Sequence, residues 1–156
     1  MHCPNCGSNQ LQSNESAPGL LTLKCGVCAG TWIQASHYWA WIEKNGGNLP
    51  EQPVDEKSLR MVESPKARIC PECGCIMCRH EVGHGVGFTV DRCSACGGFW
   101  LDKGEFEALQ RRNLHDDIHF VFSQAWQQQV QRNRQADLFE ARMRAILGPD
   151  AYAEAR

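Results

Sequence analysis

Five Cys-x-x-Cys pairs constrain this 156-residue chain more than any other feature of its sequence. All ten cysteines fall in them: Cys3/Cys6, Cys25/Cys28, Cys70/Cys73, Cys75/Cys78 and Cys93/Cys96. No apolar run approaches the ~20 residues of a membrane helix, and the first residues do not resemble a signal peptide, so we expect a cytoplasmic chain with no membrane partner. In a reducing compartment, closely spaced cysteines are metal ligands more often than disulfides. The pairs therefore predict thiolates that bind a metal.

The chain contains two copies of one module. Residues 25–34 align with residues 93–102, with cysteines, a glycine and a tryptophan in the same places. Upstream, residues 3–7 align with residues 70–74 as Cys-Pro-x-Cys-Gly. Two residues between cysteines let both sulfurs reach one face of a tight turn, and a hairpin that joins two such turns gives tetrahedral Cys₄ ligation. We therefore expect one Cys₄ site in each copy, although four sulfurs suit iron as well as zinc.

The residue patterns between and after the cysteines predict a small zinc-stabilised α+β fold. It consists of two Cys₄ zinc ribbons, each a β-hairpin plus a short helix, followed by amphipathic C-terminal helices. The expected domains are a first ribbon at 1–44, a linker at 45–66, a second ribbon at 67–112, a helical segment at 113–148 and a tail at 149–156. The expected elements are strands at 20–24, 76–82 and 86–92, a loop at 13–19, helices at 36–44 and 103–112, and a helical stretch at 114–147 interrupted at 127–135.

The second copy is similar to a known family. Residues 70–73 followed by residues 90–106 resemble the transcription-factor-IIB-type zinc-finger family of small bacterial zinc ribbons, whose hallmark is Cys-x-x-Cys-Gly-Gly-x-Trp-Leu-Asp-x-Gly-Glu. The resemblance covers residues 68–110 well and residues 1–43 in degraded form. It implies a zinc ribbon without catalytic activity. Carried over by position and by the repeat, it implies two structural Zn²⁺ ions held by Cys3, Cys6, Cys25, Cys28, Cys70, Cys73, Cys93 and Cys96.

Cys75 and Cys78 are the two cysteines outside these sets. Five residues after the second cysteine of the knuckle, the first copy has Leu11 and the second has Cys78. We therefore expect Cys78 to fill a small buried apolar position, as free cysteines often do. Ligand exchange with Cys70 and Cys73 is one alternative, and a reactive dithiol is another.

Charge and motifs limit the function. The formal net charge is −2, the isoelectric point is near 6.3, and none of the four segments 1–43, 44–66, 67–112 and 113–156 has a basic excess, which disfavours nucleic acid as a partner. The chain has no catalytic Ser/His/Asp set, P-loop or dinucleotide fingerprint, and a Cys₄ zinc site has no open position for water. We therefore expect a protein that is not an enzyme.

The apolar residues of the helical segments indicate how such a protein could act. Residues 38–42 carry large side chains around more than half of a short helix, so at least one aromatic ring should be exposed. We expect a non-enzymatic adaptor that binds a protein partner or a second copy through the Trp39/Trp41 region and the C-terminal helices. The alternatives are a transcription-related nucleic-acid-binding protein and a thiol redox or zinc-handling protein that uses Cys75 and Cys78.

Overall fold

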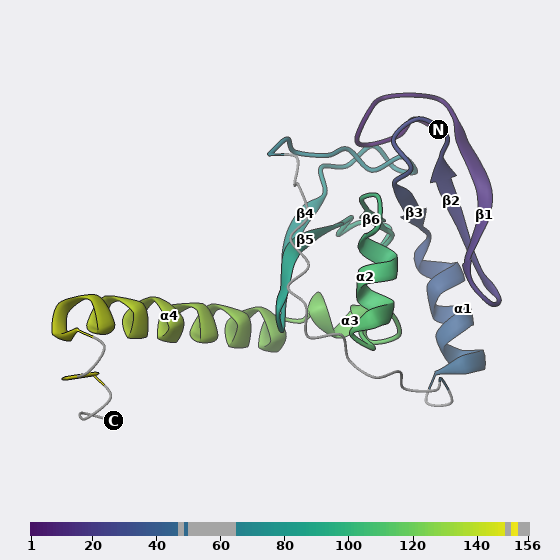
Figure 1. The fold of residues 1–156 in the computed structure, drawn as a ribbon. Helices are drawn as coiled ribbons and strands as arrows, with labels where there is room; N and C mark the ends of the chain where they lie inside the picture. The colour runs from purple at the N-terminus through teal and green to yellow at the C-terminus, as the bar shows by residue number, and fades with distance from the viewer. Residues whose placement is uncertain (47–48, 50–64, 149–150, 153–156) are drawn as a thin grey trace.

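The computed structural model describes residues 1–46, 49, 65–148 and 151–152. These residues form a small α+β fold with two Cys₄ clusters, an antiparallel sheet, short helices and a long C-terminal helix (Figure 1). Most of the expected linker at 45–66 and of the tail at 149–156 lies outside the described residues.

One antiparallel sheet contains six strands from both copies, in the order β1-β2-β3-β6-β5-β4. The strands are β1 (Leu11–Ala17), β2 (Leu20–Cys25), β3 (Thr31–Ile33), β4 (Cys78–Gly83), β5 (Val86–Arg92) and β6 (Phe99–Leu101). β3 pairs with β6 and places Trp32 opposite Trp100, which joins the two copies. The strand order of the first copy, β1-β2-β3, is therefore repeated in reverse by β6-β5-β4 of the second copy, on the other side of this strand pair. The bounds of the five expected segments stay a prediction, but the two ribbons share a single sheet.

The described residues form the helices α1 (Ala35–Asn45), α2 (Glu105–Arg111), α3 (Ile118–Val121) and α4 (Gln124–Leu147). α1 and α2 follow β3 and β6, at equivalent places in the two copies, so the expected helix of each ribbon is present. At the start of α2, the Glu105 carboxylate accepts a hydrogen bond from the Asp102 N–H at 2.7 Å. α4 extends away from the rest of the molecule (Figure 1).

The loop expected at residues 13–19 is mostly a strand, so that prediction was wrong. β1 pairs with β2 from Leu11 onward, and the turn lies only between Ala17 and Leu20. The polar side chains that suggested a loop bond across the strand pair: the Ser16 and Thr22 hydroxyls lie 2.9 Å apart. Cross-strand hydrogen bonds of this kind stabilise a strand despite its polar composition.

The interruption expected at residues 127–135 was also wrong, because α4 is continuous through it. Gln and Arg have good helix propensities, so a polar run need not break a helix. The helix begins at a clear cap, where the Ser123 hydroxyl accepts a hydrogen bond from the Trp126 N–H at 3.2 Å.

Candidate metal centres

Each ribbon brings together four sulfur atoms that lie within 4.8 Å of one another. The two sets are the eight cysteines that the sequence predicted as ligands. The close Sγ–Sγ pairs are Cys3–Cys28 at 3.5 Å, Cys6–Cys25 at 3.6 Å, Cys70–Cys96 at 3.5 Å and Cys73–Cys93 at 3.4 Å. A Zn–S distance of about 2.3 Å gives a tetrahedron with edges of about 3.8 Å. Both donor sets therefore fit a structural zinc ion with small adjustments.

The first cysteine pair of each ribbon is presented by a tight turn. The Gly7 N–H donates to the Cys3 carbonyl at 2.9 Å, and the Gly74 N–H donates to the Cys70 carbonyl at 3.0 Å. Both glycines have a positive φ, 74° and 73°, which residues with a side chain rarely adopt. The glycine after the second cysteine of this pair is therefore part of what makes a metal-binding turn.

Local hydrogen bonds favour the thiolate form at two ligands. Burial raises the pKa of Cys25, but hydrogen bonds from the Cys28 N–H, the Ser8 hydroxyl and the Val27 N–H outweigh it and bring the pKa to about 6. The pKa of Cys73 is lowered to about 7, first by the backbone N–H of Cys75 and then by the Cys93 thiol. A ligand that is already a thiolate near neutral pH loses no proton when it binds metal.

The two metal sites share one buried layer, which contains Trp32 and Trp100. Each indole packs on the ribbon opposite to its own. An added Cβ at Gly30 would lie 2.2 Å from the Trp100 ring, and one at Gly98 would lie 2.4 Å from the Trp32 ring. The knuckle loop that each indole covers therefore belongs to the other copy.

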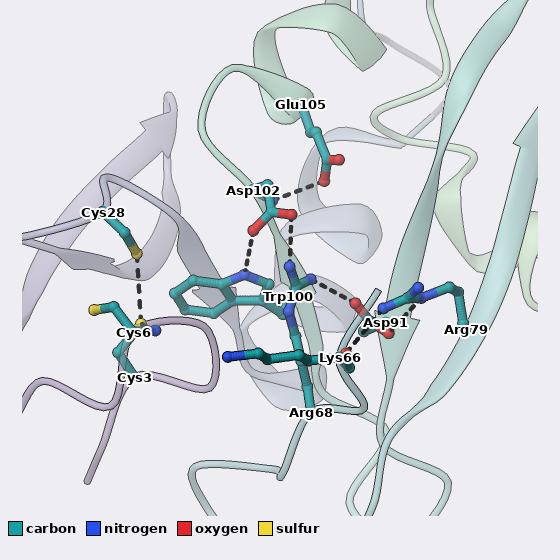
Figure 2. Close-up of polar contacts among 10 residues, drawn as sticks. All are labelled: Cys3, Cys6, Cys28, Lys66, Arg68, Arg79, Asp91, Trp100, Asp102 and Glu105. Carbon is teal, nitrogen blue, oxygen red and sulfur yellow. Dashed lines mark hydrogen bonds and ion pairs between the residues drawn. The ribbon is translucent and has the colours of Figure 1, made fainter. Parts of the chain in front are cut away.

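A buried charge network is centred on Arg68, which lies two residues before the metal ligand Cys70 (Figure 2). The Arg68 guanidinium donates to Asp91 at 2.5 Å and to Asp102 at 2.6 Å. Asp102 also accepts from the Trp100 Nε1–H at 3.0 Å. The network therefore connects the segment just before Cys70 to β5 and to the indole at the ribbon junction.

The first ribbon lacks this network. Met1 lies two residues before Cys3, as Arg68 does before Cys70, and Leu23 pairs with Trp32 as Asp91 pairs with Trp100. The Trp32 Nε1–H is buried without a hydrogen-bond partner among the described residues. Arg68 was not singled out from the sequence. Alignment of the two copies could have identified it, because an arginine stands where the first copy has the apolar Met1.

The expectation for Cys78 was wrong, because both Cys78 and Cys75 are exposed. Cys78 pairs with Arg92 in the sheet, so the register places Met77 opposite Cys93, as Leu11 lies opposite Cys25. Met77 is accordingly the buried residue, at 5% exposure. Met77 lies four residues after Cys73, whereas Leu11 lies five residues after Cys6, so counting five residues from the knuckle gave the wrong residue. Neither Cys75 nor Cys78 belongs to a four-sulfur set.

The aromatic residues of α1 divide as expected. Tyr38 and Trp41 are buried, whereas Trp39 is 52% exposed. The Trp41 Nε1–H donates to the Pro18 carbonyl at 3.0 Å, which ties α1 to the hairpin of the first ribbon. Trp39 lies at the edge of a pocket of about 130 Å³ between the two ribbons, together with Arg92 and Phe122. In the expected Trp39/Trp41 contact region, only Trp39 is therefore exposed to solvent, whereas Trp41 is buried.

The fold and its two donor sets define a zinc-binding protein of the ribbon class. Residues 69–112 match the family model described as "Transcription factor zinc-finger", the TFIIB-type zinc ribbon. The match confirms the resemblance for the second ribbon, whereas the first cysteine cluster, at residues 3–28, lies outside the match. Comparison with curated proteins and with solved structures gives no match. No helix in the described part of the chain is long and apolar enough to cross a membrane.

Proposed function

We propose that this protein is a non-enzymatic adaptor of the cytoplasm, in which the paired zinc ribbons form a rigid body and α4 is a contact arm for a second copy. The exposed outer half of α4 carries the proposal. Each four-cysteine site leaves zinc no open coordination position, which argues for a structural rather than a catalytic metal. Pairing of two arms would give an assembly that presents two copies of the ribbon surface.

The inner end of α4 is anchored on β4. The Trp126 Nε1–H donates to the Val82 carbonyl at 2.8 Å, and the Gln127 amide donates to the Glu81 carbonyl at 2.8 Å. Val130 is buried and packs against Gly83. Every residue from 131 to 139 is exposed, and from 140 to 147 only two are partly buried. The arm is therefore held at one end and open to solvent along the rest.

The outer half of α4 carries a narrow apolar stripe. Its members recur at spacings of three and four residues, the a and d pattern of a coiled coil: Ala136, Phe139, Met143 and Ile146. Phe139 is 66% exposed and Ile146 is 70% exposed. The identical stripe on α4 of a second copy can cover this apolar stripe.

Charge favours a parallel alignment of the two arms. In a parallel pair the flanking positions bring Gln135 near Glu140 of the second copy, and Arg142 near Leu147, so like charges do not meet. An antiparallel pair would instead place Glu140 of one copy near Glu140 of the other, so like charges would meet. Arg132 occupies the preceding d position, where it would face Arg132 of the second copy. Because these like charges repel each other, we expect pairing only from Ala136 onward.

Sedimentation velocity of the zinc-loaded full chain over a wide concentration range tests this proposal. We expect a concentration-dependent dimer, and we expect Phe139→Glu or Ile146→Glu to leave a monomer. Leu138→Glu is the matched control, because Leu138 is 62% exposed but lies about 120° around the helix from the centre of the stripe, outside the proposed contact. Circular dichroism and zinc content verify that each variant is folded. A wild-type chain that is monomeric at every concentration, or equal effects at Leu138 and Phe139, would contradict the proposal.

A transcription-related role in binding nucleic acid is the second candidate. The family description favours it, and so does the local charge of the arm. Residues 131–147 carry four arginines against two acidic residues: Arg132, Arg134, Arg142, Arg144, Asp137 and Glu140. Contacts to phosphates make affinity fall steeply with salt. Absence of binding to nonspecific duplex DNA at low salt would exclude this role, and a steep salt dependence that is lost in an Arg142→Gln/Arg144→Gln variant would support it.

A further inference from the structure

We propose that Cys73 and Cys75 form a peroxide-reactive thiol pair, whose oxidation to a disulfide removes one ligand from the second metal site. The pair consists of a metal ligand and an exposed cysteine that is not a ligand, separated only by Gly74. The first ribbon has no such pair, because it has Ser8 where the second has Cys75.

Equivalent backbone hydrogen bonds place Cys75 and Ser8 in the same position. The Cys70 N–H donates to the Cys75 carbonyl at 2.8 Å, and the Cys3 N–H donates to the Ser8 carbonyl at 2.7 Å. Ser8 shows where a side chain at this position reaches, because its hydroxyl lies 3.3 Å from the Cys6 sulfur. The Cys75 side chain starts from the equivalent backbone position, so rotation about its Cα–Cβ bond brings its sulfur beside the Cys73 sulfur. A sulfur atom therefore stands beside the second site where the first has an oxygen.

Both members of the pair are accessible to a small oxidant. Cys73 and Cys75 are exposed, whereas Cys70 and Cys93, on the inner side of the same cluster, are 2% and 0% exposed. Thiol oxidation follows exposure and thiolate character. Attack should therefore begin on the outer side of the second site.

The geometry favours Cys73 over Cys78 as the partner of Cys75. Ile76 forms a β-bridge with Ile69, and β4 begins at Cys78, so the chain from Cys75 to Cys78 is close to extended. Side chains three residues apart on an extended chain point to opposite faces. The Cys78 thiol is therefore directed away from Cys75.

The reaction is a two-electron oxidation by hydrogen peroxide. The Cys75 sulfur attacks one peroxide oxygen, the O–O bond breaks, and Cys75 becomes a sulfenic acid while one water leaves. The Cys73 thiolate then attacks the Cys75 sulfur; the S–S bond forms, the S–O bond breaks, and the hydroxide takes a proton and leaves as a second water. The two sulfurs supply the two electrons that reduce the peroxide. Cys70, Cys93 and Cys96 remain as ligands, and zinc is held less tightly.

Stoichiometric hydrogen peroxide added to the full chain loaded with two zinc ions tests this inference. A chromogenic chelator and native mass spectrometry measure zinc release, and peptide mass spectrometry locates the disulfide. We expect release of one of the two ions, a Cys73–Cys75 disulfide, and recovery with dithiothreitol and added zinc.

Exchange of the residues between the two copies supplies the controls. Cys75→Ser copies the first ribbon and should retain both ions under the same peroxide dose, and Cys78→Ser should behave as the wild type. Ser8→Cys should make the first site release its ion as well. Release from Cys75→Ser at the wild-type rate, or a disulfide that maps to Cys75–Cys78 or Cys73–Cys93, would overturn the inference. If Ser8→Cys does not load zinc, Cys75→Ser and the disulfide map still decide the question.

Discussion

Substitution of Arg68 by methionine should strongly destabilise the second ribbon. Arg68 is 3% exposed and pairs with Asp91, which is 2% exposed, and with Asp102. Removal of one partner of a buried ion pair costs about 3–5 kcal/mol, because the remaining charge is buried without compensation. Arg79 also contacts Asp91, at 3.3 Å, and partly compensates it. We therefore expect Arg68→Met to lower the free energy of unfolding by about 3 kcal/mol, at the low end of this range.

Two further variants separate charge burial from loss of packing. Arg79→Met removes a cation whose side chain is 32% exposed, and such pairs contribute only about 0–1 kcal/mol. Arg68→Met/Asp91→Leu copies Met1 and Leu23 of the first ribbon. Replacement of a buried ion pair by apolar residues is often neutral or stabilising. The double variant leaves Asp102, which is 17% exposed and keeps its bond to the Trp100 Nε1–H, so it should be more stable than Arg68→Met alone.

Denaturant unfolding at a fixed free zinc concentration is the appropriate assay, since metal binding contributes directly to the folding free energy. Tryptophan fluorescence reports on Trp100, whose indole N–H bonds to Asp102 in the same network. The reasoning is refuted if Arg68→Met is no more destabilising than Arg79→Met, or if the double variant is as unstable as Arg68→Met alone.

Three other predictions follow from the metal sites and the ribbon junction. Gly98→Ala should cost about 1–3 kcal/mol in the same assay, because its Cβ would overlap the Trp32 ring. Gly26→Ala should cost less, because the nearest atom to its Cβ is the end of the flexible Gln10 side chain, at 3.1 Å, and the Gln10 backbone is at 3.7 Å. Removal of zinc by a strong chelator should abolish the near-ultraviolet tryptophan signal, and a retained signal would contradict a structural role for the metal. Acidification should release zinc, because protons compete for the thiolates. For Cys25, with a pKa of about 6, and Cys73, with a pKa of about 7, this competition grows as the pH falls through these values, and zinc retained well below pH 5 would contradict it.

The metal ligands could be predicted from the sequence because their spacing is local and repeated. Two cysteines on one tight turn need no knowledge of the rest of the fold, and the repeat gives the same answer twice. The pairing of Trp32 with Trp100 could not be predicted, since it depends on a contact between copies that leaves no spacing in the chain. The position of Cys78 was missed for a related reason. Sheet register, rather than distance from the knuckle, decides which side chain is buried, and a one-residue shift exchanges the two faces of a strand.

The crossed packing of the two indoles couples the metal sites to each other. Trp100 extends from β6 of the second ribbon onto Gly30, which lies in the knuckle loop of the first metal site. Trp32 makes the reciprocal contact with Gly98. Neither ribbon can therefore lose its metal without disturbing the surface on which the indole of the other ribbon rests. Because β3 of the first ribbon pairs with β6 of the second, unfolding of one ribbon exposes a strand edge of the other. Loss of zinc from the second site alone should thus reduce the stability of the first ribbon, although all four of its ligands remain intact.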